Sequence, residues 1–229
     1  MNINDTPTLL DLLKQVEERF SNASICRFTE EQKNRYSELF NQLVSANSNS
    51  STSDAIKGKA LEEIVAFVLT NTGGLFEVYR NVKTNTNEID HFINLTPQGK
   101  LLAENGLINP LYKHMICECK NYQNNISVTY IGKFYSLLKS CHSRFGILFS
   151  FKGVSGSGWN YGSGLIKKIY MSDISSNNNY IIIDFNFGDF KTIYDGGNFL
   201  EIIDNKLTSL RLDTDFKKYI SNHPAELLI

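Results

Sequence analysis

Apolar side chains recur every three or four residues near the start of the chain, a period typical of amphipathic helices. The pattern predicts two helices within residues 7–46. Thr29 and Gln32 are spaced as a capping box, which predicts that the second helix begins just after Thr29. The apolar positions are Leu9, Leu12, Leu13, Val16 and Phe20 in the first helix, and Tyr36, Leu39, Phe40, Leu43 and Val44 in the second.

An unbroken run of Asn, Ser and Thr follows these helices, from Asn47 to Ser53. Polar composition of this kind is typical of a linker or an exposed loop. We therefore expect an N-terminal helical appendage over residues 1–50 and a main domain over residues 51–229.

Helical and strand-like patterns alternate beyond this polar run. Helical spacing predicts a helix over 54–72, which Gly73-Gly74 ends, and a polar turn is predicted over 84–87. Residues 97–110 have the composition of a loop. Strands are predicted at 75–82, 88–95, 112–120, 145–151 and 180–185, and further helices at 128–141, 165–171 and 197–206.

This order of elements predicts the α/β class, with a mixed central sheet whose faces are covered by helices. The strand-helix-strand unit over residues 112–151 predicts a parallel pair of strands, because parallel neighbours need a long crossover connection. The sequence has no internal repeat.

Composition narrows the class of protein further. Hydrophobic residues make up 41% of the 229 residues, which is enough for a core and excludes a globally disordered chain. No apolar run reaches the ~20 residues of a membrane helix, and no secretory signal is expected at the start. The four cysteines show no disulfide framework, so we expect a reduced, cytoplasmic setting.

Charge is distributed unevenly along the chain. The formal net charge is -1, but residues 111–170 hold eight basic residues and one acidic residue, a charge of +7 that leaves -8 for the remainder. Such a segment can present a basic surface to a polyanion such as nucleic acid. The alternative is an ordinary solvated face without a ligand.

Glu118 and Lys120 are the first candidates for chemistry. They flank Cys119 on a predicted strand, so alternation places both on one face, opposite Cys117 and Cys119. Burying a carboxylate or an ammonium alone is costly, so the two should share a polar site.

Asp90 lies near the middle of the strand predicted at 88–95. If this strand neighbours the one that carries Glu118, the two carboxylates can meet and bind a hard cation such as Mg²⁺. A metal there can polarise a phosphate and activate water, and Lys120 can orient that water or stabilise the transition state. The alternative is an ion pair on an edge strand with incidental carboxylates.

These motifs resemble those of the PD-(D/E)xK nucleases and, more closely, of Mrr-like restriction endonucleases. The resemblance covers roughly residues 55–206. The sequence departs from the family pattern where Ile89 replaces the proline, where Asn85 to Glu88 replaces a Gly-rich stretch, and where Cys119 fills the middle of the Glu-x-Lys motif. The matching segments are Lys57-Gly58, Leu61-Glu62-Glu63, Ile89-Asp90, Ile116 to Tyr122, the helix at 128–141, Phe145 to Ser150, and Asn198-Phe199-Leu200.

The resemblance implies a restriction-endonuclease-like fold and a metal site of Asp90, Glu118 and a glutamate from the preceding helix. Glu62 matches the motif position best, and Glu63 remains an alternative. The resemblance also implies Mg²⁺ as the cofactor, for which Mn²⁺ is expected to substitute, and double-stranded DNA as the substrate.

Four lysines outside the motif are candidates for contacts with a DNA backbone. The alternative is that these lysines are ordinary exposed residues of helices and of a surface loop, without a ligand. His91 is expected to face away from Asp90 and to pack in the structure, and the Cys-x-Cys pair lacks partners for a zinc site. The candidate lysines are Lys133, Lys152, Lys167 and Lys168.

Two classes of function follow from these features. The leading hypothesis is a Mg²⁺-dependent endonuclease acting in restriction or anti-phage defence. The alternative is a non-cleaving module on the same fold that binds nucleic acid or another protein. In either case the N-terminal helices over residues 7–46 could form a homodimer or dock a partner subunit.

Overall fold

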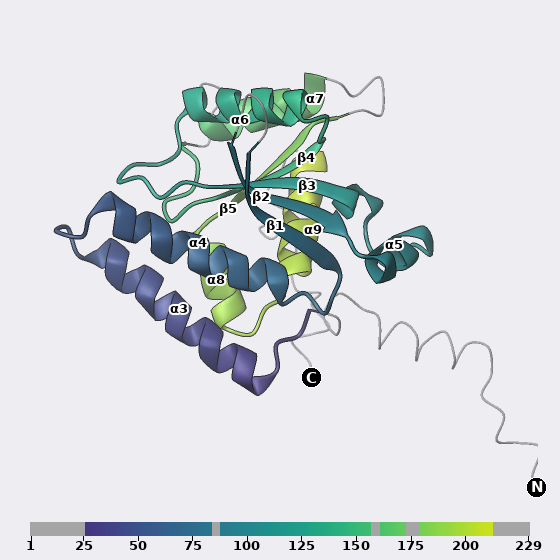
Figure 1. The fold of residues 1–229 in the computed structure, drawn as a ribbon. Coiled ribbons are helices and arrows are strands. Elements are labelled where there is room, and N and C mark those ends of the chain that lie inside the picture. The colour runs from purple at the N-terminus through teal and green to yellow at the C-terminus, as the bar shows by residue number, and fades with distance from the viewer. Residues whose placement is uncertain (1–25, 84–87, 157–160, 173–178, 213–229) are drawn as a thin grey trace, which may run out of the picture.

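A five-stranded mixed sheet forms the centre of the molecule (Figure 1). The computed structural model describes residues 26–83, 88–156, 161–172 and 179–212, so the helix predicted within residues 7–20 and the turn at 84–87 lie outside the described residues. The strands follow one another across the sheet in chain order: β1 (Phe76–Lys83), β2 (Glu88–Leu95), β3 (His114–Cys119), β4 (Phe145–Phe149) and β5 (Ile181–Phe185).

The sheet changes from antiparallel to parallel at β3. β1, β2 and β3 pair in antiparallel fashion, whereas β3 pairs with β4, and β4 with β5, in parallel. Each parallel pair is connected by a helix, α6 (Val128–Ser140) between β3 and β4, and α7 (Gly162–Ser172) between β4 and β5. The mixed sheet and the parallel pair predicted over 112–151 are thereby confirmed.

Helices cover both faces of the sheet, as the α/β class requires. α6 and α7 lie on one face, where Ile131 and Ile166 pack with Ile116 and Leu148 of the sheet (Figure 1). The opposite face carries α4 (Asp54–Thr70), α8 (Phe187–Tyr194) and α9 (Phe199–Arg211), which share a larger core with the other side of the same strands.

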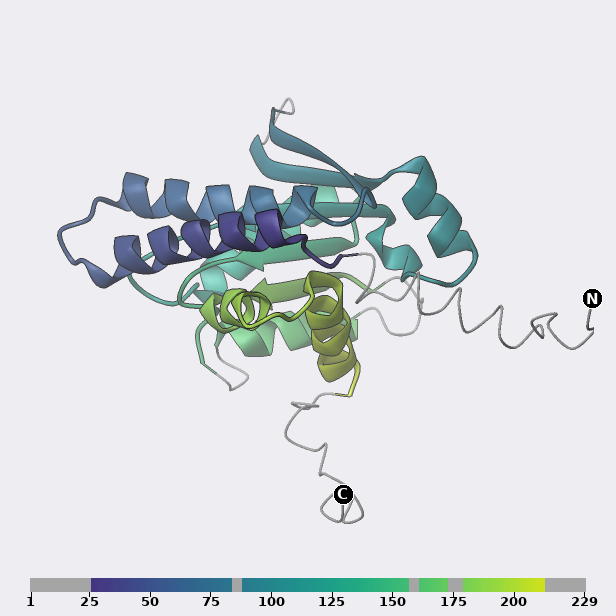
Figure 2. The same ribbon diagram turned by 90° about the horizontal axis from the view of Figure 1, so that it is seen from below.

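α3 (Glu30–Ser48) runs beside α4 in both views (Figures 1 and 2). It begins with the predicted capping box, in which Thr29 and Gln32 each bind the other's backbone amide. Leu43 is fully buried in the shared core, and the Tyr36 hydroxyl donates to the carbonyl of Phe190 in α8 at 2.8 Å. The division of the chain at residue 50 stays a prediction, although α3 packs on α4 and α8 as part of one core.

The prediction of a loop over 97–110 is wrong for the first half of that segment, which forms α5 (Pro97–Glu104). Thr96 caps this helix by accepting from the amide of Gly99, and Pro97 fills the first turn, where its missing N–H costs nothing. A 3₁₀ helix, η2 (Pro110–Lys113), then leads into β3. Two short turns of helix give too few apolar positions for a visible period.

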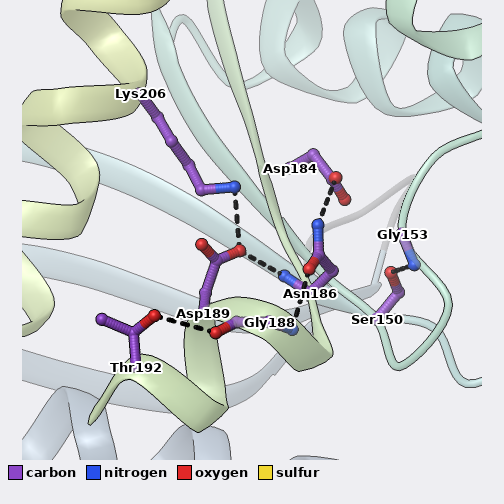
Figure 3. A network of polar contacts seen from close by, with 8 residues as sticks. All are labelled: Ser150, Gly153, Asp184, Asn186, Gly188, Asp189, Thr192 and Lys206. Carbon is purple, nitrogen blue, oxygen red and sulfur yellow. Dashed lines mark hydrogen bonds and ion pairs between the residues drawn. The ribbon is translucent and has the colours of Figure 1, made fainter. Parts of the chain in front are cut away.

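α8 is a second helix without a counterpart among the predictions, and it is held by a polar network (Figure 3). Asn186 and Asp189 form its capping box, and Lys206 of α9 lies 2.8 Å from the Asp189 carboxylate. The side chain of Asn186 also donates to Asp184 at the end of β5. The network therefore fastens β5, α8 and α9 to one another.

In the part of the chain that the structure describes, no helix combines the length and the apolar character needed to cross a membrane.

Candidate active site

Asp90 is brought to β3 because β2 and β3 are neighbours in the sheet. The last pair of their register joins His91 to Cys117. Asp90 precedes His91, and its carboxylate accepts a hydrogen bond from the backbone amide of Cys119, two residues after Cys117, at 2.8 Å. This bond fixes the Asp90 side chain against the end of β3.

Lys120 follows directly after β3, and its ammonium lies between the two carboxylates. Nζ is 2.9 Å from Glu118 Oε1 and 3.5 Å from Asp90 Oδ2. The backbone amide of Lys120 donates to the carbonyl of Phe149 at 2.8 Å, which continues the pairing with β4. The three side chains are between 11% and 25% exposed, so they form a shielded polar cluster that still reaches solvent.

Lys120 carries a proton in this cluster. Burial acts to lower the pKa of its ammonium, but the hydrogen bond to Glu118 and the charges of Glu118 and Asp90 outweigh burial and raise the pKa above its usual range. At neutral pH the group is therefore a cation that can donate hydrogen bonds to an anion.

Strand alternation places the neighbours of the cluster as predicted. Met115, Cys117 and Cys119 point into the larger core, whereas Ile116 packs under α6 on the face that also carries Glu118. Burial raises the pKa of both thiols far above the usual range, so they stay protonated and behave as core residues.

His91 packs in the interior beside Cys119, with 4.0 Å between Nδ1 and the Cys119 sulfur. Burial lowers the pKa of its imidazole to about 4, so the ring is neutral at physiological pH. This placement agrees with the packing role expected from the sequence.

Glu118 has two oxygens in different surroundings. Oε1 accepts from the Tyr130 hydroxyl at 2.8 Å and lies 2.9 Å from Lys120, whereas Oε2 is buried and has no hydrogen-bond partner among the described residues. Tyr130 stands in the first turn of α6, and burial followed by the charge of Glu118 raises the pKa of its hydroxyl. Sequence reasoning did not assign Tyr130 to the site, because nothing in the spacing links a helical tyrosine to a strand carboxylate.

The two candidate glutamates of α4 differ in their surroundings. Both line a cavity of about 510 Å³ together with Gly58, Lys59 and Arg80. The Glu63 carboxylate lies 3.9 Å from the Lys59 ammonium, and the Glu63 side chain is 40% exposed. Burial chiefly raises the pKa of the Cys119 thiol, and the charges of Asp90, Glu62 and Glu118 add to the rise. The charge of Glu62 thus reaches the Cys119 thiol, and the place of Glu62 in the metal site stays a prediction.

Asn121 ties the helix of Glu62 to the strand of Glu118. Its side-chain amide donates to the backbone carbonyl of Lys57, in the first turn of α4, at 2.8 Å. Asn121 and Lys57 are both buried. This bond joins two elements that are 64 residues apart in the sequence, so it was not visible as a spacing.

The four lysines predicted to contact nucleic acid lie on three parts of the fold, because Lys167 and Lys168 are neighbours on α7. Lys133 is exposed on α6, and Lys152 is exposed just after β4. Lys168 is exposed on α7, whereas Lys167 lines a cavity of about 330 Å³ between α7, β5 and α9. Their contact with nucleic acid stays a prediction.

The side chains of the cluster offer a limited set of donors for a hard cation. Within the described residues, no group of three or more His, Cys, Asp or Glu side chains forms a preassembled metal cluster. Asp90 and Glu118 are instead bridged by the Lys120 ammonium. Carboxylate oxygens are nevertheless the ligands that Mg²⁺ prefers, and the buried Oε2 of Glu118 has an unused acceptor. The residues therefore fit a divalent cation.

A family model described as a restriction endonuclease, built on the Mrr catalytic domain, matches residues 53–174. The match covers 122 of 229 residues, more than half of the chain. It includes α4, the strands β1 to β4 and the whole polar cluster. Comparison with curated proteins and comparison with solved structures gave no match.

Proposed function

We propose that this chain, which belongs to the Mrr-type restriction endonuclease family, is a Mg²⁺-dependent enzyme that hydrolyses phosphodiester bonds in double-stranded DNA. The observation that carries the proposal is the convergence of Asp90, Glu118 and Lys120 at the end of β3. A family match alone gives a class of protein, whereas this convergence supplies the groups that a hydrolytic site needs.

In this proposal Asp90, Glu118 and Glu62 hold the metal ion. When bound, Mg²⁺ would supply Lewis-acid polarisation of a phosphate oxygen and a coordinated water of lowered pKa; Mn²⁺ is expected to substitute. Asp90 presents a carboxylate that the amide of Cys119 keeps in place. Glu118 presents its unpartnered Oε2.

Besides the metal ion, the Lys120 side chain supplies a positive charge to the proposed site. Its ammonium can donate hydrogen bonds to the attacking water and to a non-bridging phosphate oxygen, where negative charge grows in the transition state. The raised pKa of this ammonium keeps it protonated, which favours electrostatic stabilisation over a role as general base.

The substrate class is supported by charge as well as by family. Residues 111–170 carry +7, and this segment includes Glu118 and Lys120. Contacts from Lys133, Lys152, Lys167 and Lys168 to phosphates would fix the DNA without reading its sequence. A role in restriction or anti-phage defence, in the cytoplasm, belongs to the same proposal, and the four free cysteines are compatible with a reduced setting.

The test is nicking of supercoiled plasmid by the purified full chain with Mg²⁺, with Mn²⁺ and with EDTA. We expect cleavage with either metal and none with EDTA, and we expect Lys120→Ala to remove cleavage while it leaves DNA binding and the melting temperature close to those of wild type. Lys191→Ala is the matched control, because Lys191 is an exposed lysine of α8 that pairs with Asp195.

Two results would count against the proposal. Cleavage that persists in EDTA would refute metal dependence, and a fully active Lys120→Ala variant would refute the assignment of the site. Tight DNA binding without cleavage under every metal condition would instead favour a non-cleaving nucleic-acid-binding module on the same fold.

A further inference from the structure

Two donors share a single oxygen of Glu118. The Tyr130 hydroxyl donates to Oε1 at 2.8 Å, and the Lys120 ammonium lies 2.9 Å from the same atom. The other oxygen, Oε2, is buried without a hydrogen-bond partner in the described part of the chain. Burying an acceptor without a hydrogen-bond partner costs free energy, and such atoms in native proteins usually bind a water, an ion or a ligand. The asymmetry divides the carboxylate into one held oxygen and one available oxygen.

The surroundings of Tyr130 fix this side chain in a position to hold Oε1 of Glu118. Ser127 caps α6 and accepts from the backbone amide of Tyr130, so the residue begins on the first turn of a regular helix. The next residue, Ile131, is fully buried in the core under this helix. The Tyr130 ring also meets the ring of Tyr122 edge-on, with 6.0 Å between centroids.

Lys120 alone would not fix the carboxylate in the same way. An ammonium on a four-carbon stem is a mobile point charge, and here it also lies 3.5 Å from Asp90. A phenol has two side-chain torsions and a rigid ring, so a hydrogen bond from Tyr130 restricts the terminal torsion of Glu118 at little entropic cost. A tyrosine hydroxyl keeps its proton at neutral pH, which makes it a permanent donor here.

We propose that Tyr130 is a positioning residue, which holds Oε1 of Glu118 so that Oε2 is presented to the divalent cation. The inference rests on the proposed function, because it assigns Tyr130 to the same metal site. Partners that orient a metal ligand typically account for about 10- to 100-fold in metal affinity or activity.

The test is Tyr130→Phe, which removes one oxygen atom and keeps the ring. Binding of Mn²⁺ to the full chain without DNA is measured by electron paramagnetic resonance, and the Mg²⁺ concentration for half-maximal plasmid nicking is measured in parallel. Tyr135→Phe is the matched control, because Tyr135 lies on the same helix and contacts Tyr180 and Lys139 through its ring.

We expect Tyr130→Phe to weaken Mn²⁺ binding by about 10-fold or more and to raise the half-maximal Mg²⁺ concentration similarly. Saturating Mg²⁺ should restore most of the turnover, and the melting temperature without metal should match that of Tyr135→Phe. A merely structural role would instead lower the melting temperature and leave metal affinity unchanged.

The failure of this inference is distinguishable from the failure of the proposed function. Wild-type chain that cleaves with Mg²⁺, together with Tyr130→Phe that binds Mn²⁺ as wild type does, would overturn the role of Tyr130 alone. Wild-type chain that neither binds Mn²⁺ nor cleaves would overturn both.

Discussion

The Asp90 carboxylate accepts a hydrogen bond from the backbone amide of Cys119 at 2.8 Å, just beyond His91 and Cys117, the last pair of the β2–β3 register. A side chain therefore joins the two strands where their backbone pairing ends. The same Oδ2 atom lies 3.5 Å from the Lys120 ammonium. Asp90 is consequently both a structural acceptor and a member of the polar cluster, and the two roles can be separated by substitution.

Asp90→Asn should abolish cleavage but preserve most of the stability, because an amide oxygen can still accept from Cys119. Asp90→Ala should abolish cleavage and also destabilise the fold by about 1.5–3 kcal/mol, the usual worth of a hydrogen bond to a charged group. Denaturant unfolding of both variants, beside plasmid nicking, measures the difference. Equal stability of the two would show that the bond to Cys119 contributes little.

Glu62→Gln should reduce metal-dependent cleavage by at least about 10-fold, because it removes the charge of a proposed metal ligand. Glu63→Gln breaks an exposed contact with Lys59 and should change the stability by less than about 0.5 kcal/mol. Nicking rates against Mg²⁺ concentration compare the two. Loss of activity in Glu63→Gln with a normal Glu62→Gln would exchange the assignment.

A chain that begins at Ser53 should lose cooperative folding. It lacks α3, whose buried side chains pack on α4 and α8, and each large apolar side chain contributes about 1.5–3 kcal/mol when buried. Their sum approaches the total stability of a typical domain. A chain that begins at Cys26 keeps α3 and is the control. A sharp, unshifted thermal transition of the shorter chain would instead support an independent appendage before residue 50.

Asp184 should make stability depend on pH in a direction opposite to that of a salt-bridged carboxylate. Burial raises the pKa of its carboxyl, although Lys206 and the hydrogen bond from Asn186 act to lower it. With a folded-state pKa above the unfolded value, its contribution to stability is present in acid and is lost as the pH rises through the folded-state pKa.

Asp184→Asn removes this titration. The variant should gain stability relative to wild type when denaturant unfolding at neutral pH is compared with unfolding at mildly acidic pH. Asp195→Asn, at an exposed carboxylate of the α8 C-terminus, is the control for a general effect of charge. A difference between wild type and Asp184→Asn that stays constant with pH would contradict the raised pKa.

Local patterns in the sequence determined much of the framework. The capping box at Thr29 and Gln32 located the start of α3, and the alternation around Glu118 placed its side chain opposite Cys117 and Cys119. These features depend on neighbours within a few residues of the chain, and the period of the helix or strand is sufficient to predict them. The family resemblance of residues 55–206 likewise depended on motifs in linear order. The family match over 53–174 confirms the family, and the part of the resemblance after residue 174 stays a prediction.

Only the tertiary structure decided how the site is assembled. The bond from Cys119 to Asp90 spans 29 residues, and the one from Asn121 to Lys57 spans 64. The hydroxyl of Tyr130 reaches Glu118 because the crossover after β3 returns α6 over the sheet. Such contacts depend on which strands become neighbours and on how helices pack across them. No local period encodes these choices, since burial of the whole core sets them together.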